Sequence, residues 1–415
     1  MLVRAMLLLI ALLGTADAAK HSDRSTYGLR FELELTADNS LASGSITVDQ
    51  TRSLLREARF RAPTSRYSDF SGDGDVQRDG SFVVWRPPSD GGRLRYKVLI
   101  DNQRKSGSYD ARVTRRWAIF RGDDVFPAAT TRHAPGASSR SKLSFKLPGK
   151  WSVVAPFKDY PDGKSFDVVN AERRFDRPIG WIVAGRLGVR RDTIENIEVA
   201  IAGPINHGIH RISMLALLRW TLPVLTNEAE VRPPYLSIVS ANDAMWRGGL
   251  SSPNSIYVHA ERPLLSENAT STLLHEIVHV LMPVPTEKEH DWIDEGLAEY
   301  LTLVTLRDSG TISPERFERS LDKFERRGRG VKTLLTRHAS GEVTARAVSV
   351  FSQLDRELSD KTDGSKDIFD LVRALVREEQ PVGLERLRTV SAGLMNGIPA
   401  AALSYAQIPG PRPPP

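Results

Sequence analysis

The sequence has 415 residues, of which 40% are hydrophobic and 26% are charged. This composition is typical of a globular protein and excludes a disordered or fibrous chain, and the length suggests two or three domains. The net charge is +6, but no basic run is interleaved with aromatic residues, so nucleic-acid binding is not expected. The sequence contains no cysteine, which excludes disulfide bonds.

Residues 1–19 have the pattern of a cleavable signal peptide. Arg4 supplies a positive charge, and Ala5–Leu13 form an apolar run that is too short to span a bilayer. Ala16–Ala18 fit a cleavage site between small residues. The expected location is therefore the bacterial periplasm or the outside of the cell, and no stable membrane anchor is expected. An uncleaved anchor is the alternative.

Residues 20–200 are predicted to form a β-rich N-terminal domain. Tyr27–Leu35 alternates apolar and polar residues with a period of two. Turn-rich pieces such as Gly72–Asp75 separate this run from later ones, which predicts an antiparallel sandwich or barrel. Residues 134–142 are expected to be a flexible loop, and residues 151–201 a second β portion. The other predicted strands of the domain cover residues 44–48, 82–85, 93–100, 117–120 and 142–147.

The next segment mixes helix and strand patterns. Residues 209–225 have the apolar spacing of a helix. His207 and His210 lie at its start, where a capping or surface role is favoured over a second metal site because no carboxylate is near them in sequence. Strands are predicted at residues 235–241 and 255–260.

The most specific motif of the chain is His275-Glu276-Ile277-Val278-His279, an H-E-x-x-H sequence in an apolar helical stretch. Residues four apart lie on one face of a helix, so both imidazoles can reach a single metal ion. Glu276 projects beside them, where it can hold a metal-bound water. The alternative is a buried helix with two core histidines.

A third ligand is needed for a catalytic zinc site. Glu295 supplies it in the segment Trp292–Tyr300, which follows after a break at Pro283 and Pro285. Glu299 lies one helical turn later, where it could accept the free ring N–H of a zinc-bound histidine. A solvated surface glutamate is the alternative for Glu299.

These two motifs resemble those of the gluzincin zinc peptidases, in particular the alanyl-aminopeptidase and glycyl-aminopeptidase families. The resemblance implies one Zn²⁺ per chain, held by His275, His279 and Glu295, with Glu276 as the general base. It also implies an α+β architecture with an N-terminal antiparallel β domain, a thermolysin-like zinc domain at residues 201–310 and a C-terminal helical region. The gap before the ligand glutamate is fifteen residues instead of the usual eighteen, which indicates a shorter loop between the helices.

Two departures from the family pattern concern the substrate site. The family often has G-x-M-E-N before a strand that pairs with the substrate, and the matching positions here run from Gly248 and Gly249 to Ser252, without the glutamate. A simple hairpin turn is the alternative at the two glycines. The family's transition-state tyrosine aligns with Thr344, and Arg346 is a candidate substitute for stabilising the oxyanion.

Residues 311–405 are predicted to form the C-terminal helical region, with helices at 314–327, 343–358 and 368–377. Residues 406–415 are proline-rich and expected to be disordered. The favoured function is an exported zinc metallopeptidase that acts on a peptide or protein substrate. A zinc-stabilised peptide-binding pseudoenzyme is the second hypothesis, and an exported structural protein with an accidental motif is the third.

Overall fold

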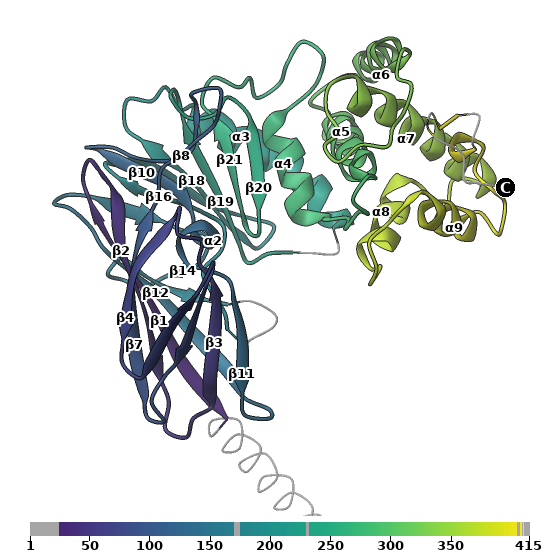
Figure 1. Ribbon diagram of the computed structural model, residues 1–415. Coiled ribbons are helices and arrows are strands. Elements are labelled where there is room, and N and C mark those ends of the chain that lie inside the picture. The colour runs from purple at the N-terminus through teal and green to yellow at the C-terminus, as the bar shows by residue number, and fades with distance from the viewer. Residues whose placement is uncertain (1–24, 170–174, 230–231, 405–406, 409, 411–415) are drawn as a thin grey trace, which may run out of the picture. The chain divides into compact units, whose positions relative to one another are not determined.

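The computed structural model describes residues 25–169, 175–229, 232–404, 407, 408 and 410 (Figure 1). The predicted signal peptide, and most of the predicted proline-rich tail, lie outside these residues. The described chain is a mixed α+β structure with a sheet-rich N-terminal part and helices toward the C-terminus. It forms two compact units. Unit 1 comprises residues up to 188 with 203–205 and 243–246, and unit 2 comprises 189–202, 206–242 and 247–415.

The described residues of unit 1 form β-strands and one short helix. Its elements are β1 (Thr26–Thr36), β2 (Asn39–Asp49), β3 (Leu55–Arg61), β4 (Tyr67–Gly72), β5 (Asp75–Asp79), β6 (Phe82–Arg86), β7 (Gly91–Leu99), β8 (Asn102–Gln103), β9 (Tyr109–Val113), β10 (Trp117–Arg121), α2 (Gly122–Val125), β11 (Ala129–His133), β12 (Ser138–Lys146), β13 (Ser152–Val154), β14 (Lys158–Asp159), β15 (Ser165–Val168) and β16 (Trp181–Gly185). The strands form sheets in the orders β14-β15-β12-β1-β2-β7-β4, β13-β16-β10-β9-β8 and β11-β3-β6-β5.

The alternating pattern of β1 determines which side of the seven-stranded sheet faces the core. Leu29, Phe31 and Leu33 are fully buried, while Arg30, Glu32 and Glu34, which alternate with them, are exposed or half-buried. This is the arrangement expected when one face of a sheet packs on a core and the other faces water. The predicted strand at residues 27–35 is therefore confirmed, as are the five other strands predicted in this domain.

Two details of the N-terminal prediction are wrong. Ser138–Lys146 forms strand β12, whereas residues 134–142 were expected to be a loop. β12 pairs with β1 in parallel, with Arg30 opposite Lys142, so the sheet is not purely antiparallel. The segment looked like a loop because its outward residues are polar and its first inward residues, Ser139 and Ser141, are small serines that are nevertheless buried.

Unit 2 contains a five-stranded sheet in the order β17-β18-β19-β21-β20. Its strands are β17 (Leu187–Ile194), β18 (Ile197–Pro204), β19 (Tyr235–Ala241), β20 (Gly249–Ser252) and β21 (Ser255–His259). β18, β19 and β21 run parallel, and β20 is an antiparallel edge strand beside β21. Helix α3 (Arg211–Glu228) connects β18 to β19, as parallel neighbours require.

The rest of unit 2 is helical (Figure 1). Its elements are α4 (Thr272–Leu281), α5 (Asp291–Asp308), α6 (Pro314–Gly328), α7 (Glu342–Lys361), α8 (Ile368–Val376), α9 (Leu384–Leu394) and the short 3-10 helix η1 (Ala401–Leu403). The helices predicted at residues 209–225, 314–327, 343–358 and 368–377 are confirmed. α4 packs against both α5 and strand β20, and a single apolar core runs from the sheet through these helices.

None of the helices in the described part of the chain is long and apolar enough to cross a membrane.

Candidate metal centre

Helix α4 presents the two motif histidines on one face. Ser271 precedes the helix, and its side chain accepts the N–H of Leu274 at 3.4 Å, which satisfies one of the free amides of the first turn. The opposite face buries Leu274, Ile277 and Leu281 in the core. This burial orients the helix so that the two histidines, four residues apart, face α5.

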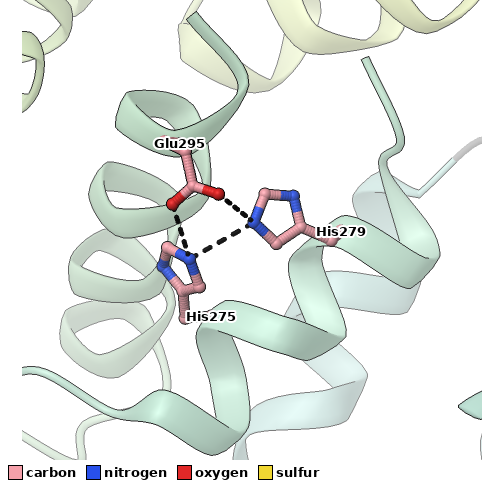
Figure 2. Close-up of side chains that lie close together, drawn as sticks. All are labelled: His275, His279 and Glu295. Carbon is pink, nitrogen blue, oxygen red and sulfur yellow. Dashed lines mark hydrogen bonds and ion pairs between the residues drawn. The ribbon is translucent and has the colours of Figure 1, made fainter. Parts of the chain in front are cut away.

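The chain turns between α4 and α5 within a short connection that contains Pro283 and Pro285. Proline removes a backbone N–H and ends a helix, so the direction of the chain can change here. α5 then begins at Asp291 and brings Glu295 back beside the two histidines (Figure 2). The helix–turn–helix arrangement predicted from the sequence is therefore present.

The three predicted ligands converge on one point. His275 Nε2 lies 3.2 Å from His279 Nε2, and the carboxylate of Glu295 lies 3.3 Å from the first nitrogen and 3.6 Å from the second. In a tetrahedral zinc site with bonds of about 2.0–2.1 Å, neighbouring ligand atoms are about 3.3 Å apart. The donor set and its spacing therefore fit zinc, and within the described residues this is the group that can hold a metal ion.

The outer nitrogens of both imidazoles have carboxylate partners. Glu299 lies 3.1 Å from His275 Nδ1, and Asp294 lies 3.1 Å from His279 Nδ1. Each contact favours a proton on Nδ1 and leaves Nε2 free to bind a metal. The helical spacing predicts the position of Glu299 beside a histidine, but the contact of Asp294 was not predicted, although an acidic residue directly before the ligand glutamate was a visible signal.

These carboxylates change the proton affinity of the histidines. Burial lowers the pKa of His275, but its hydrogen bonds with Glu295 and Glu299 outweigh burial and hold the pKa well above its usual value. Burial also lowers the pKa of His279, and Asp294 more than compensates. Burial raises the pKa of Glu295, but the interaction with His275 lowers it by more. The net pKa is below its usual value, so this carboxylate stays ionised.

Glu276 is held between α4 and the edge strand β20. Its side chain is buried and accepts a hydrogen bond from the backbone of Ser251. Burial is the largest influence on its pKa and raises it, and the charge of Glu295 acts in the same direction. A raised pKa brings a carboxylate closer to the range in which a general base works near neutral pH.

Gly249 permits this close approach. A Cβ atom at Gly249 would lie 2.7 Å from Cγ of Glu276 and 2.6 Å from the methyl group of Thr272. The hairpin-turn interpretation of Gly248 and Gly249 is wrong, because Gly249 starts β20 and the turn between β20 and β21 lies at Pro253–Asn254. The position of β20 at the sheet edge beside α4 agrees with the predicted substrate strand.

Arg346 and Thr344 lie in the first turns of α7. The guanidinium of Arg346 donates a hydrogen bond to the backbone carbonyl of Gln407 at 2.6 Å. Its described contacts therefore join it to the C-terminal segment, and none joins it to the histidines or glutamates of the metal centre. The assignment of Arg346 as an oxyanion-stabilising residue has no support from these contacts.

His207 and His210 lie outside the metal centre. They line an open cavity of about 500 Å³ together with Asn242 and Arg262, and His207 Nδ1 accepts the backbone N–H of Asn242 at 3.4 Å. His210 precedes α3 but its side chain makes no capping hydrogen bond, so the surface role applies rather than the capping role. The two histidines are not part of a metal-binding group among the described residues.

No protein-family model and no curated protein matches the sequence. Solved structures do match the fold. An aminopeptidase N family protein from Idiomarina loihiensis superposes with a TM-score of 0.63 at 15% identity, over 84% of this chain and 70% of that one. Yeast LTA4 hydrolase superposes with a TM-score of 0.55 at 15% identity, over 94% of this chain and 68% of that one. The resemblance to the gluzincin aminopeptidases, first drawn from two short motifs, is therefore confirmed at the level of the fold.

Proposed function

We propose that this protein is a zinc-dependent peptidase with a thermolysin-like catalytic domain. The observation that carries the proposal is the convergence of His275, His279 and Glu295 at tetrahedral spacing beside the buried carboxylate of Glu276. A complete ligand set with an adjacent base is the arrangement that metal-assisted hydrolysis of an acyl bond requires. The fold shared with the aminopeptidase N family protein supports the same reaction class.

The residues of the site would have separate roles in catalysis. His275, His279 and Glu295 would hold the zinc ion, which when bound supplies Lewis-acid catalysis. Glu276 would take a proton from the attacking water and deliver it to the leaving amine. β20, as an edge strand, would pair with the substrate backbone by main-chain hydrogen bonds.

The proposed setting is extracytoplasmic, either periplasmic or secreted, and the proposed substrate is a peptide or protein. Support for export comes from the pattern of residues 1–19. Ser251 stands where the related families often carry a glutamate that binds the substrate amino terminus. Without that carboxylate, a requirement for a free amino terminus is not part of the proposal.

A peptide-binding protein with little turnover is the second candidate. It is favoured by Thr344, which stands where the related peptidases have a tyrosine that donates to the oxyanion. Loss of one such donor typically lowers the rate by about 10²–10³. The two candidates share the metal site and differ in turnover alone.

The test combines metal analysis with cleavage of a mixed peptide library. The proteins to compare are wild type, Glu295→Ala and Glu276→Gln. Glu325→Gln is a matched control, because Glu325 is an exposed residue of α6 that pairs with Arg329. We expect one zinc ion per wild-type chain, loss of zinc in Glu295→Ala, and retained zinc without cleavage in Glu276→Gln.

Each outcome decides between the candidates. Chelator-sensitive cleavage that disappears in Glu276→Gln but persists in Glu325→Gln establishes the peptidase. Stoichiometric zinc and peptide binding without cleavage in the wild type establishes the binding protein. Absence of zinc from the wild type after incubation with the metal rejects both.

A further inference from the structure

The outer face of the seven-stranded sheet in unit 1 is rich in exposed cations. Arg30 on β1, Arg140 and Lys142 on β12, and Arg95 on β7 all point away from the core and are exposed. We call these four residues the basic face. Within the described residues, none of the four forms an ion pair with a carboxylate, whereas Arg93 on the same sheet pairs with Glu32.

The strand register brings two of these cations, Lys142 and Arg30, side by side and places Arg93 on the same row. Lys142 lies opposite Arg30 in the parallel pair β12–β1, and Arg30 lies opposite Thr47, which in turn lies opposite Arg93. Neighbouring strands are about 4.8 Å apart, so this row spans about 14 Å. Like charges that face each other across a strand pair destabilise a sheet. The repulsion between these cations lowers the free energy of unfolding, and an anionic partner would reduce this repulsion.

The carboxylates on the same face balance only part of its positive charge. The carboxylate of Glu32 accepts hydrogen bonds from Arg93 at 2.6 Å and from Lys146 at 2.9 Å, so one negative charge is shared by two cations. Asp167 is opposite Lys142 in the register and also accepts a hydrogen bond from the hydroxyl of Tyr160 at 2.6 Å. Of the other acids on this face, Glu34 is opposite Lys146, and Asp49 is opposite Gly28, which follows Tyr27 on β1.

The outer face of the four-stranded sheet in the same unit has cross-strand ion pairs. Arg59 pairs with Asp79 at 3.0 Å. Arg86 pairs with Glu57 and with Asp75, both at 2.8 Å. Cross-strand pairs of opposite charge stabilise an exposed sheet face. Arg56, Arg61 and Arg132 on this sheet are exposed and form no ion pair among the described residues, which makes them a matched comparison for the basic face.

We propose that the basic face binds a polysaccharide that carries phosphate or sulfate groups. The row of cations matches repeated anionic groups along an extended polymer, and Thr47 and Ser144, half-buried on the same face, offer hydroxyls to the sugar units. Binding here would hold the protein on a polyanionic matrix and does not depend on the metal centre.

Two other polyanions fit this face less well. Single-stranded nucleic acid is usually held by stacking on open aromatic rings, but the ring of Tyr160 is covered by the amino group of Lys142 at 4.9 Å from its centroid. A lipid surface needs apolar side chains beside the cations. The exposed pair Leu41 and Leu99 lies six residues along β2 from Thr47, or about 20 Å away.

The test is affinity for heparin, a sulfated polysaccharide, at 0.15 M and 0.5 M salt, with neutral dextran as the uncharged control. The purified full chain is compared with the triple variant Arg30→Gln/Arg140→Gln/Lys142→Gln. The matched control is Arg56→Gln/Arg61→Gln/Arg132→Gln, which removes the same charge from exposed positions on the four-stranded sheet. We expect at least about tenfold weaker binding and a smaller salt dependence in the first triple variant, and little change in the second.

A gain-of-function variant guards against a simple folding defect. Glu32→Gln removes the carboxylate shared by Arg93 and Lys146, so it should bind heparin more tightly than wild type. Equal losses in the two triple variants would show attraction by net charge alone and overturn the proposal. So would absence of heparin binding at 0.15 M salt, or tighter binding to single-stranded DNA or to phosphatidylglycerol vesicles than to heparin.

Discussion

Asp294 orients a zinc-binding histidine from the outside. Its carboxylate lies 3.1 Å from Nδ1 of His279, and loss of such a partner typically weakens metal binding about 10–100-fold. We expect a loss of this size in Asp294→Ala, measured by competition with a chromophoric chelator. Asp294→Asn should lose less, because its amide oxygen can still accept the ring N–H. Wild-type affinity in Asp294→Ala would show that the contact has no positioning role.

Gly249 sets the distance between the edge strand and the general base. In Gly249→Ala the new methyl group would press on Glu276 and Thr272, so the carboxylate must shift. A displacement of about 1 Å at a catalytic group can cost up to about 100-fold in rate. We expect kcat to fall on that scale while zinc content is unchanged. Gly330→Ala, where a Cβ meets no atom within 4 Å, is the control and should keep the wild-type kcat.

Metal binding should release protons near neutral pH. The carboxylates around His275 and His279 raise the pKa of both imidazoles in the metal-free protein, and a metal binds only the neutral form. The stabilising histidine–carboxylate attraction is complete below the ordinary histidine pKa of about 6.5 and is lost as the pH rises through the raised values. Zinc affinity should therefore increase with pH over that range. Calorimetry in two buffers with different protonation enthalpies measures the release, and binding at pH 7 without it would contradict this prediction.

At the level of single residues, sequence spacing was enough to place His275 and His279 on one face, whereas Glu295 was predicted from the second motif. An i, i+4 spacing acts through helix geometry alone and needs no tertiary information. The role of Asp294 depends on how α5 is rotated against α4, and the contact of Ser251 with Glu276 depends on where β20 lies. Neither arrangement is encoded in local spacing.

Helices α5 and α7 pack closely at Gly296, the residue that follows the ligand Glu295. A Cβ at Gly296 would lie 2.5 Å from Cβ of Ala347 and 3.0 Å from the ring of Phe351. Overpacking of this kind typically costs about 1–3 kcal/mol, so Gly296→Ala should lower the free energy of unfolding by that amount, measured by urea denaturation. Gly393→Ala in α9 has open space and should be neutral or slightly stabilising. Equal stability of Gly296→Ala and wild type would mean that α7 moves away at no cost.

Strands were harder to predict than helices where their partners lie far away in the sequence. The helices of unit 2 carry their apolar stripe within a few turns, so the pattern is local. β12 has serine at two buried positions and becomes a strand because β1 supplies a parallel partner more than a hundred residues earlier. The basic face is equally invisible in the sequence, since Arg30 and Lys142 become neighbours through that pairing alone.

The two units have separate apolar cores. One core contains residues from Tyr27 to Ala184, and the other contains residues from Ile194 to Ile408. Zinc would bind entirely within the second, and a ligand at 100 times its Kd stabilises its host by about 2.7 kcal/mol. We therefore expect a chelator to lower the Tm of one calorimetric transition, that of unit 2, and to leave that of unit 1 in place. A shift of both transitions together would show that the cores unfold as one.

The parallel pairing of β1 with β12 also bears on synthesis of the protein. β1 lies between β2 and β12 in its sheet, so its second edge has no partner in a nascent chain that has not yet reached Ser138. An open strand edge can pair with other chains. The sheet around β1 is thus complete only after the chain has been made as far as Lys146.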